Sequence, residues 1–223
     1  MKDLIDIKYW IFDLDNTLYS GQTKVFAEVS KNMSAYISKK LDIDLLEAKE
    51  LQKKYFYENG TTLSGLMKYD KIDPHEFLEF VHNIDISWLP KDLLLRQELI
   101  KIKEKKYIFS NGSHSHVENV TKQLGIEDLF DGVFAITDAD FVPKPNVEPY
   151  KKMIKKFDLD PKKSILIEDI AHNLEQAKNL GMKTCWLENN ETFAKKDADK
   201  PYIDYKIKSL PSFLQKINVL KAA

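Results

Sequence analysis

The stretch that decides the fold is YWIFDLDNTLYSG, from Tyr9 to Gly21. Its apolar run, YWIF, ends on two aspartates, Asp13 and Asp15, and the turn-forming Asn16 follows at once. Residues two apart on a strand point to the same face, so the two carboxylates converge whether the strand continues or has just ended. Converging carboxylates repel each other unless a cation or a shared proton relieves them. The stretch therefore predicts a buried strand that carries a site at its carboxyl end.

Length and composition describe an ordinary globular protein. The chain has 223 residues, of which 43% are hydrophobic and 31% charged, enough for one large domain or for a core domain with an insertion. Its 34 basic and 35 acidic residues leave a net charge of −1, which gives no overall field to recruit nucleic acid or an anionic membrane. Arg96 is the only arginine, so lysine and backbone N–H groups would have to bind any ligand phosphate.

Location and assembly are also predicted from composition. The first ten residues contain acids where a signal peptide needs an apolar run, and no apolar stretch approaches the ~18 residues of a membrane-spanning helix. The single cysteine, Cys185, excludes an internal disulfide and suits a reducing compartment. We expect a soluble cytoplasmic protein, a monomer or homodimer, that binds neither nucleic acid nor membranes.

Short apolar runs typical of β-strands recur along the chain, at Tyr9–Phe12, Tyr107–Phe109, Val133–Ile136, Ser164–Ile167 and Thr184–Leu187. Helical segments separate the last four runs, at Val117–Leu124, Glu148–Phe157 and Leu174–Leu180. Strands that alternate with helices in this way predict an α/β fold with a parallel sheet covered by helices on both faces.

The alternation breaks between about residue 23 and residue 95. Three helical segments follow one another there with no strand between them, at Val25–Leu41, Leu45–Tyr57 and Pro74–Val81. We therefore predict a core domain made of residues 1–18 and 96–223, and an all-helical domain of residues 19–95 inserted after the first strand.

Polar groups follow the other predicted strands as well. Ser110 and Asn111 come after the second, Lys144 lies between two prolines after the third, and Glu168 and Asp169 come directly after the fourth. Ligands of open α/β sheets bind outside the carboxyl ends of the strands, so these groups should meet. A carboxylate pair, a hydroxyl, an ammonium and a second acidic pair suit phosphoryl transfer with a hard divalent cation such as Mg²⁺.

These motifs resemble those of the haloacid dehalogenase superfamily of hydrolases. Its phosphatases carry DxDxT, a Ser or Thr after the second core strand, a Lys and a terminal acidic pair, and here the same motifs occur in order at Asp13, Asp15, Thr17, Ser110, Lys144, Glu168 and Asp169. The resemblance covers most of residues 8–25 and 96–205. It implies a Rossmann-like core with a helical cap inserted after the first motif, and hydrolysis of phosphate monoesters.

The resemblance also implies a role for each site residue. Asp13 would attack phosphorus and form an aspartyl phosphate, while Asp15 would protonate the leaving oxygen and later deprotonate water. Asp13, the backbone carbonyl of Asp15 and Asp169 would hold Mg²⁺, with Glu168 in the outer shell. The phosphoryl group would be bound by Asn16, Ser110, Asn111 and Lys144. Because Asp15 must carry a proton to act as an acid, we expect that crowding by Asp13 and Glu168 keeps it neutral.

Several alternatives remain open within and beyond this family. The dehalogenases lack an acid at the position of Asp15, so a phosphatase is favoured over a dehalogenase. A phosphonatase, a phosphomutase of sugar phosphates, and a phosphatase of sugar phosphates or phosphoglycolate all share the core. A non-catalytic binding module on the same fold is a further alternative, because one fold hosts many functions.

The substrate is predicted from the helical segment. Residues Glu58 to Asp85, together with DLDNTLYS in the first motif, resemble the pyrimidine 5′-nucleotidase group, which implies a nucleoside 5′-monophosphate as substrate. The candidate substrate contacts are Tyr19, Thr61, Thr62 and His114. The plain alternative is that residues 60–62 only turn the chain between two helices. For His116 we expect no metal-binding role, and for His82 a surface or packing position.

Overall fold

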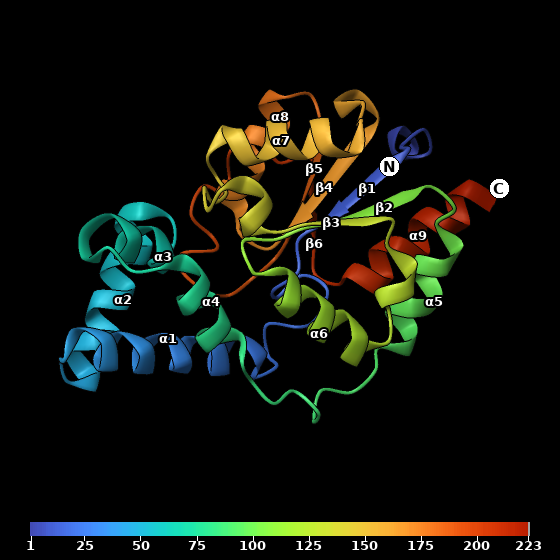
Figure 1. Ribbon diagram of the computed structural model, residues 1–223. Helices are drawn as coiled ribbons and strands as arrows, with labels where there is room; N and C mark the ends of the chain where they lie inside the picture. Colours follow the sequence, from blue (N-terminus) through green and yellow to red (C-terminus); the bar gives the residue numbers. More distant parts are fainter. Residues whose placement is uncertain (223) are drawn as a thin grey trace.

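A six-stranded parallel sheet forms the centre of the molecule (Figure 1). The computed structural model describes residues 1–222. The strand order is β3-β2-β1-β4-β5-β6, so the first strand of the chain lies in the middle of the sheet. The strands are β1 (Tyr9–Phe12), β2 (Lys105–Phe109), β3 (Gly132–Phe134), β4 (Ser164–Glu168), β5 (Lys183–Leu187) and β6 (Tyr205–Ile207).

The alternation of side chains along β1 divides the core into two layers. Trp10 and Phe12 lie in one apolar cluster with Ile165, whereas Ile11 lies in another cluster with Leu166. Trp10, Ile11 and Phe12 are completely buried, which explains why this strand is apolar on both faces. Its carboxylates begin only where the strand has ended, at Asp13.

Helices cover both faces of the sheet. Figure 1 shows α7 and α8 on one side and α5, α6 and α9 on the other. Their bounds are α5 (Leu93–Lys101), α6 (His114–Leu124), α7 (Val147–Phe157), α8 (Leu174–Asn179) and α9 (Leu210–Ala222). Shorter turns complete the chain at η1 (Lys2–Leu4), η2 (Leu66–Asp70), η3 (Glu127–Leu129), η4 (Ile136–Ala139), η5 (Pro161–Lys163) and η6 (Ala171–Asn173). The predicted α/β class, a parallel sheet with helices on both faces, is confirmed.

Four helices lie beside the sheet, on the left of Figure 1, and in the sequence they fall between β1 and β2. They are α1 (Val25–Leu41), α2 (Leu45–Asn59), α3 (Thr62–Gly65) and α4 (Pro74–His82), and we call them the helical insertion. An apolar cluster that includes Val29, Ile37 and Phe77 holds them together. The predicted division at residues 18/19 and 95/96 stays a prediction, and its second boundary falls inside α5, which packs against α9.

Some elements differ from the sequence expectations. The third strand ends at Phe134, and Ile136 already begins the turn η4, because the chain bends there rather than extending the sheet. The sequence did not predict α5, α9 or β6. Strand β6 has only three residues, none of them buried, so it lacks the apolar run that marks the inner strands.

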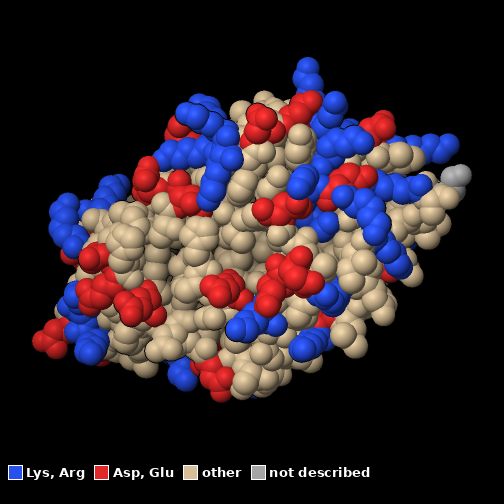
Figure 2. Space-filling model, turned by 45° about the vertical axis from the view of Figure 1, so that its right-hand side comes forward, with Lys and Arg blue, Asp and Glu red and all other residues tan. Residues whose placement is uncertain are grey.

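Charges are mixed over the surface. Figure 2 shows lysines and acidic residues interspersed on the face it presents. No helix within residues 1–222 is both long enough and apolar enough to cross a bilayer. The predicted location and oligomeric state stay predictions.

Candidate active site

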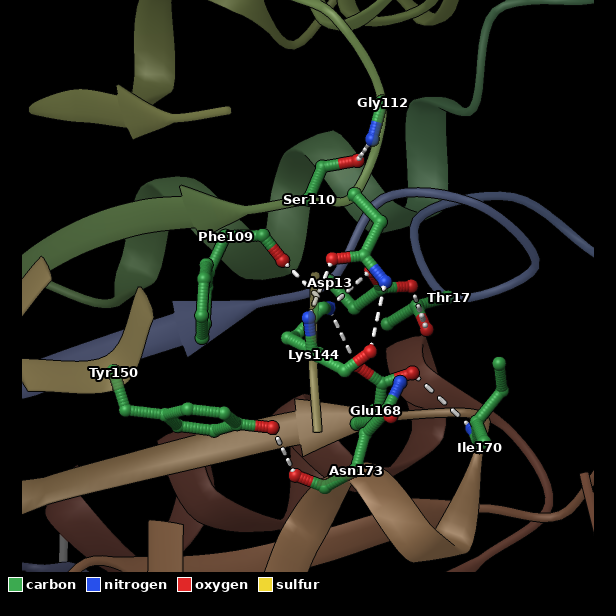
Figure 3. A network of polar contacts seen from close by, with 11 residues as sticks. Asp13, Thr17, Phe109, Ser110, Gly112, Lys144, Tyr150, Glu168, Ile170 and Asn173 are labelled. Atoms are coloured by element: carbon green, nitrogen blue, oxygen red, sulfur yellow. Dashed lines mark hydrogen bonds and ion pairs between the residues drawn. The ribbon is translucent and has the colours of Figure 1, made fainter. Parts of the chain in front are cut away.

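The polar groups that follow the strands meet at the carboxyl edge of the sheet (Figure 3). Asp13 comes directly after β1, Ser110 directly after β2, and Glu168 is the last residue of β4, with Asp169 next. Because β1 pairs with both β2 and β4, these ends lie side by side. Asp13, Ser110, Glu168 and Asp169 are all at most 5% exposed.

Lys144 lies at the centre of this edge. Its ammonium donates to Asp13 Oδ1 at 2.8 Å, to Glu168 Oε2 at 2.6 Å and to the Phe109 carbonyl at 2.8 Å. Burial by itself lowers the pKa of this ammonium, but the two carboxylates raise it above its usual range, so Lys144 stays charged. The backbone of Lys144 is held by Asn111, whose Oδ1 accepts from the Lys144 N–H at 2.9 Å. The structure thus gives Asn111 the task of fixing the lysine loop.

Two carboxylates share that one ammonium, and a third lies beside them. One oxygen each of Asp13, Glu168 and Asp169 lies within 4.8 Å of the others, and all three residues are buried. Burial, with the charge of Glu168, raises the pKa of Asp13 to about 7 and that of Asp169 well above its usual range. Three carboxylates against one ammonium leave two negative charges in excess when all are ionised. Hard oxygen ligands with that excess fit a divalent cation such as Mg²⁺.

Glu168 differs from Asp169 in this cluster. Its Oε2 accepts from Lys144, and its Oε1 accepts from the N–H of Ile170 at 3.2 Å. Asp169, by contrast, accepts on Oδ2 from Asn189 at 2.6 Å. Because both Glu168 oxygens already accept protein hydrogen bonds, this residue is less free to ligate a cation directly.

Asp15 lies in a different environment from Asp13. Its Oδ1 accepts from the Tyr19 hydroxyl at 2.5 Å and lies 2.8 Å from Nε2 of His116. Burial alone would raise the pKa of Asp15, but the imidazole of His116 and the Tyr19 hydroxyl together lower it to about 2. The expectation that crowding keeps Asp15 neutral is therefore wrong for this structure, because the strongest partners of Asp15 are hydrogen-bond donors.

Two histidines that the sequence analysis assigned no functional role lie behind Asp15. His116, in the first turn of α6, is 1% exposed, and its ring stacks on that of His82 with centroids 4.4 Å apart. His82 is the last residue of α4, and its Nδ1 lies 2.8 Å from the Ser113 hydroxyl. Burial, with the neighbouring His116, lowers the pKa of His82 to about 3. The sequence feature that could have pointed to His116 was its position just after the loop that follows the second predicted strand.

The loop after β2 faces the same space. The Ser110 hydroxyl accepts from the Gly112 N–H at 2.9 Å. A Cβ on Gly112 would lie 3.1 Å from the His116 ring and 3.2 Å from Ser110 Oγ, so a larger residue here would press on both groups. On the other side, the Thr17 hydroxyl donates to Asp13 Oδ2 at 3.1 Å. Asn16 adopts the left-handed conformation, with a φ of 59°, and turns the chain between the two carboxylates and Thr17.

The other predicted substrate contacts lie apart from the carboxylates. The Thr61 hydroxyl accepts from the Ser64 N–H at 3.1 Å, and the Thr62 hydroxyl donates to the Gln52 carbonyl at 3.2 Å, so both are engaged within the helical insertion. His114 is half exposed and lies 2.8 Å from Asp138. Within residues 1–222, no hydrogen bond joins these three side chains to the carboxylates of the site, Asp13, Asp15, Glu168 and Asp169. Tyr19 alone among the predicted substrate contacts reaches the site.

A family model described as haloacid dehalogenase-like hydrolase matches residues 7–181. Phosphate metabolism protein 8 of Saccharomyces cerevisiae is 31% identical over 78% of this chain, which spans 60% of the yeast protein. A glyceraldehyde 3-phosphate phosphatase of Pyrococcus furiosus is 30% identical over 94% of this chain and 92% of its own length. Among solved structures, a HAD phosphatase from Thermococcus onnurineus matches 95% of this chain and 97% of its own with a TM-score of 0.62, at 20% identity. That structural likeness concerns the fold.

Proposed function

The chain belongs to the haloacid dehalogenase-like hydrolase family, and from that premise we propose that it is a Mg²⁺-dependent phosphatase of small phosphate monoesters. The observation that carries the proposal is the state of Asp13. Lys144 fixes one of its oxygens and Thr17 the other, at the end of a buried central strand. Asp15 lies two residues away, where a leaving oxygen needs a proton.

Asp13 acts as the nucleophile in the proposed reaction. One of its oxygens attacks phosphorus, and the bond from phosphorus to the leaving oxygen breaks. Asp15 gives a proton to that oxygen, then takes one from the water that attacks the aspartyl phosphate and frees Asp13. Asp15 is ionised in this structure, but a bound phosphate dianion next to it favours the protonated form.

The remaining site residues bind the phosphoryl group or help to neutralise its charge. Lys144, Ser110 and the backbone N–H groups after Ser110 bind the phosphoryl oxygens, and Asn111 and Asn16 hold the two loops in place. Asp13, Asp169 and the backbone carbonyl of Asp15 would hold Mg²⁺, with Glu168 behind them. A cation there supplies charge neutralisation for the transferring group.

The proposed substrate class is the nucleoside 5′-monophosphates, with pyrimidines preferred. It rests on the resemblance of residues Glu58 to Asp85 to the pyrimidine 5′-nucleotidase group. A Cβ on Gly60 would lie 3.8 Å from the Lys144 carbonyl, so the helical insertion, which would select the leaving group, reaches the lysine loop. The hydroxyls of Thr61, Thr62 and Tyr19 are all engaged in hydrogen bonds, so among the predicted contacts the ring of Tyr19 and the backbone of the turn at Gly60 would contact the nucleoside.

Glyceraldehyde 3-phosphate is a second candidate substrate. The Pyrococcus furiosus relative with that name covers 94% of this chain, including the helical insertion that would select the leaving group. Because glyceraldehyde 3-phosphate is a triose phosphate, this relative supports the sugar-phosphate phosphatase among the alternatives. Phosphoglycolate as substrate, and a mutase of sugar phosphates, are weaker candidates that no relative named above supports.

A substrate panel tests the proposal. Purified protein with Mg²⁺ is assayed on UMP, CMP, AMP, glyceraldehyde 3-phosphate, phosphoglycolate, hexose phosphates and p-nitrophenyl phosphate. We expect the highest kcat/KM for UMP or CMP, and loss of turnover with EDTA. A preference for glyceraldehyde 3-phosphate would replace the substrate and keep the phosphatase. Isomerisation of β-glucose 1-phosphate would indicate a mutase, and no turnover of any ester would overturn the phosphatase in favour of a binding module.

A further inference from the structure

The two oxygens of Asp15 have different surroundings. Oδ1 accepts from Tyr19 at 2.5 Å and lies 2.8 Å from His116 Nε2. Within residues 1–222, no hydrogen bond is made to Oδ2. This second oxygen lies 3.8 Å from where a Cβ on Gly112 would stand, and that point is 3.2 Å from Ser110 Oγ. One oxygen is thus anchored, and the other is free beside the loop that would bind phosphate.

His116 is itself held firmly. Its backbone N–H donates to Ser113 Oγ at 3.2 Å, and its buried ring stacks on His82 at an interplanar angle of 14°. His82 is fixed in turn by Ser113, 2.8 Å from its Nδ1. The contacts therefore run from Asp15 through His116 to His82, and so from the loop after β1 through α6 to α4 of the helical insertion.

We propose that His116, supported by His82, is a positioning residue that directs the free oxygen of Asp15 toward the leaving oxygen of the substrate. A carboxylate on a loop can rotate about two side-chain bonds, and two donors on the same oxygen remove that freedom. Proton transfer needs the two heavy atoms within hydrogen-bond reach, and a misplacement of about 1 Å can cost about 10²-fold in rate. The inference rests on the proposed phosphatase activity and assigns a part of it to the helical insertion.

How much the reaction needs a well-placed Asp15 depends on the leaving group of the ester. An alkoxide is a poor leaving group, so an alkyl ester needs the proton of a well-placed acid, whereas p-nitrophenolate departs without one. If His116 only supported the fold, its loss would slow both esters equally. If it directs Asp15, its loss lowers kcat/KM for the alkyl ester selectively, because kcat/KM reports only the steps up to departure of the leaving group. The later deprotonation of water by Asp15 is common to both esters and affects kcat alone.

The test compares β-glycerophosphate with p-nitrophenyl phosphate in wild type, His116→Leu and His116→Gln. In His116→Leu we expect kcat/KM for the alkyl ester to fall about 10²-fold, with a fall of less than about threefold for the aryl ester. His116→Gln keeps an N–H donor and should recover much of the alkyl turnover. Inhibition by inorganic phosphate should be unchanged, since phosphate binding does not involve His116.

Two further variants extend the test. His82→Leu should lower the alkyl-to-aryl ratio of kcat/KM about 10-fold, at the lower end of the range expected for loss of an indirect contact that supports an active-site group. His75→Ala, which replaces an exposed histidine on the same helix, should leave the ratio unchanged. If His116→Leu does not fold, Tyr19→Phe removes the other donor to Oδ1 and should give the same selective loss. Equal losses for both esters, or an unchanged ratio in every variant, would overturn the inference. Wild-type protein inactive on both esters would instead overturn the proposed function.

Discussion

Asp13 and Asp15 are neighbours on one loop, yet the two halves of the site around them are opposite in character. Around Asp13, three buried carboxylates lie together, two of them share one ammonium, and the pKa of Asp13 rises to about 7. Around Asp15, donors from His116 and Tyr19 outweigh burial, and its pKa falls to about 2. The motif brings two carboxylates together, but residues far along the chain decide which charge each one carries. The surroundings of Asp13 carry an excess of negative charge that a cation can neutralise, whereas Asp15 already has its hydrogen-bond donors in His116 and Tyr19.

Replacing the nucleophile should have the largest effect. Asp13→Asn keeps the shape of the side chain but removes its nucleophilic oxygen, so kcat should fall by about 10³-fold or more with the fold intact. Steady-state kinetics on p-nitrophenyl phosphate and circular dichroism together check this. Ordinary Mg²⁺-dependent turnover in the variant would show that Asp13 is not the attacking group.

Removing Lys144 should destabilise the part of the site around Asp13. Lys144→Met leaves Asp13 and Glu168 buried without their shared ammonium, and breaking such a pair costs about 3–5 kcal/mol. Urea unfolding of the metal-free protein measures the loss. Lys152→Met is the matched control, because its partner Asp140 is largely exposed and the pair should contribute less than about 1 kcal/mol. Similar losses in both variants would mean that the Lys144 contacts are not the stabilising ones.

The two acidic residues after β4 should differ in their effect on Mg²⁺. Asp169→Asn should raise the Mg²⁺ concentration for half-maximal activity by about 10- to 100-fold, and Glu168→Gln should raise it less, since Glu168 is already occupied by Lys144 and Ile170. Activity titrated with MgCl₂ gives both values. Ca²⁺ should inhibit, because its looser coordination does not enforce the geometry of the smaller ion. An equal effect of the two variants would argue against this ranking of ligands.

The pH dependence of stability should sharpen the comparison further. Asp13 has a raised pKa in the folded chain, about 7 against its ordinary value of 3.8, so the folded state retains a proton that the unfolded state loses in this interval. Its contribution to stability is therefore largest at low pH and falls as pH rises from about 4 to about 7. In EDTA, the Tm of Asp13→Asn minus that of wild type should increase over this interval. A difference that stays constant with pH would contradict the raised pKa.

The smallest effect should come from the hydroxyl of Thr62, which is bonded neither to Asp13 nor to Asp15. Thr62→Val removes the hydrogen bond to the Gln52 carbonyl and should cost about 1 kcal/mol of stability, with substrate preference unchanged. Thermal unfolding and the UMP-to-AMP ratio of kcat/KM check both parts. A lower ratio with unchanged stability would restore the substrate contact that the sequence suggested for Thr62.

The sequence predicted what local patterns encode. The apolar run before Asp13 and the alternation of strands and helices led to the sheet, and the two prolines around Lys144 distinguished it among many lysines. His116 could not be found in that way, because a histidine at a helix start has no pattern of its own. It meets Asp15 only because α6 follows β2, the neighbour of β1 in the sheet. The charge of Asp15 depends on that contact and was mispredicted with it.

The central place of β1 also constrains how the molecule assembles. This strand is made first, yet its partners pair Tyr9 with Lys105 on one side and with Ser164 on the other. Contacts between segments so far apart in the chain form slowly, because a long loop must close before they are rewarded. During synthesis the segment YWIF therefore stays without any sheet neighbour until β2 has been made at Phe109, and without its second neighbour until β4 has been made at Glu168. An apolar strand left unpaired for that time is prone to associate with other chains, so we expect this segment to be the part of the nascent protein that most needs a chaperone.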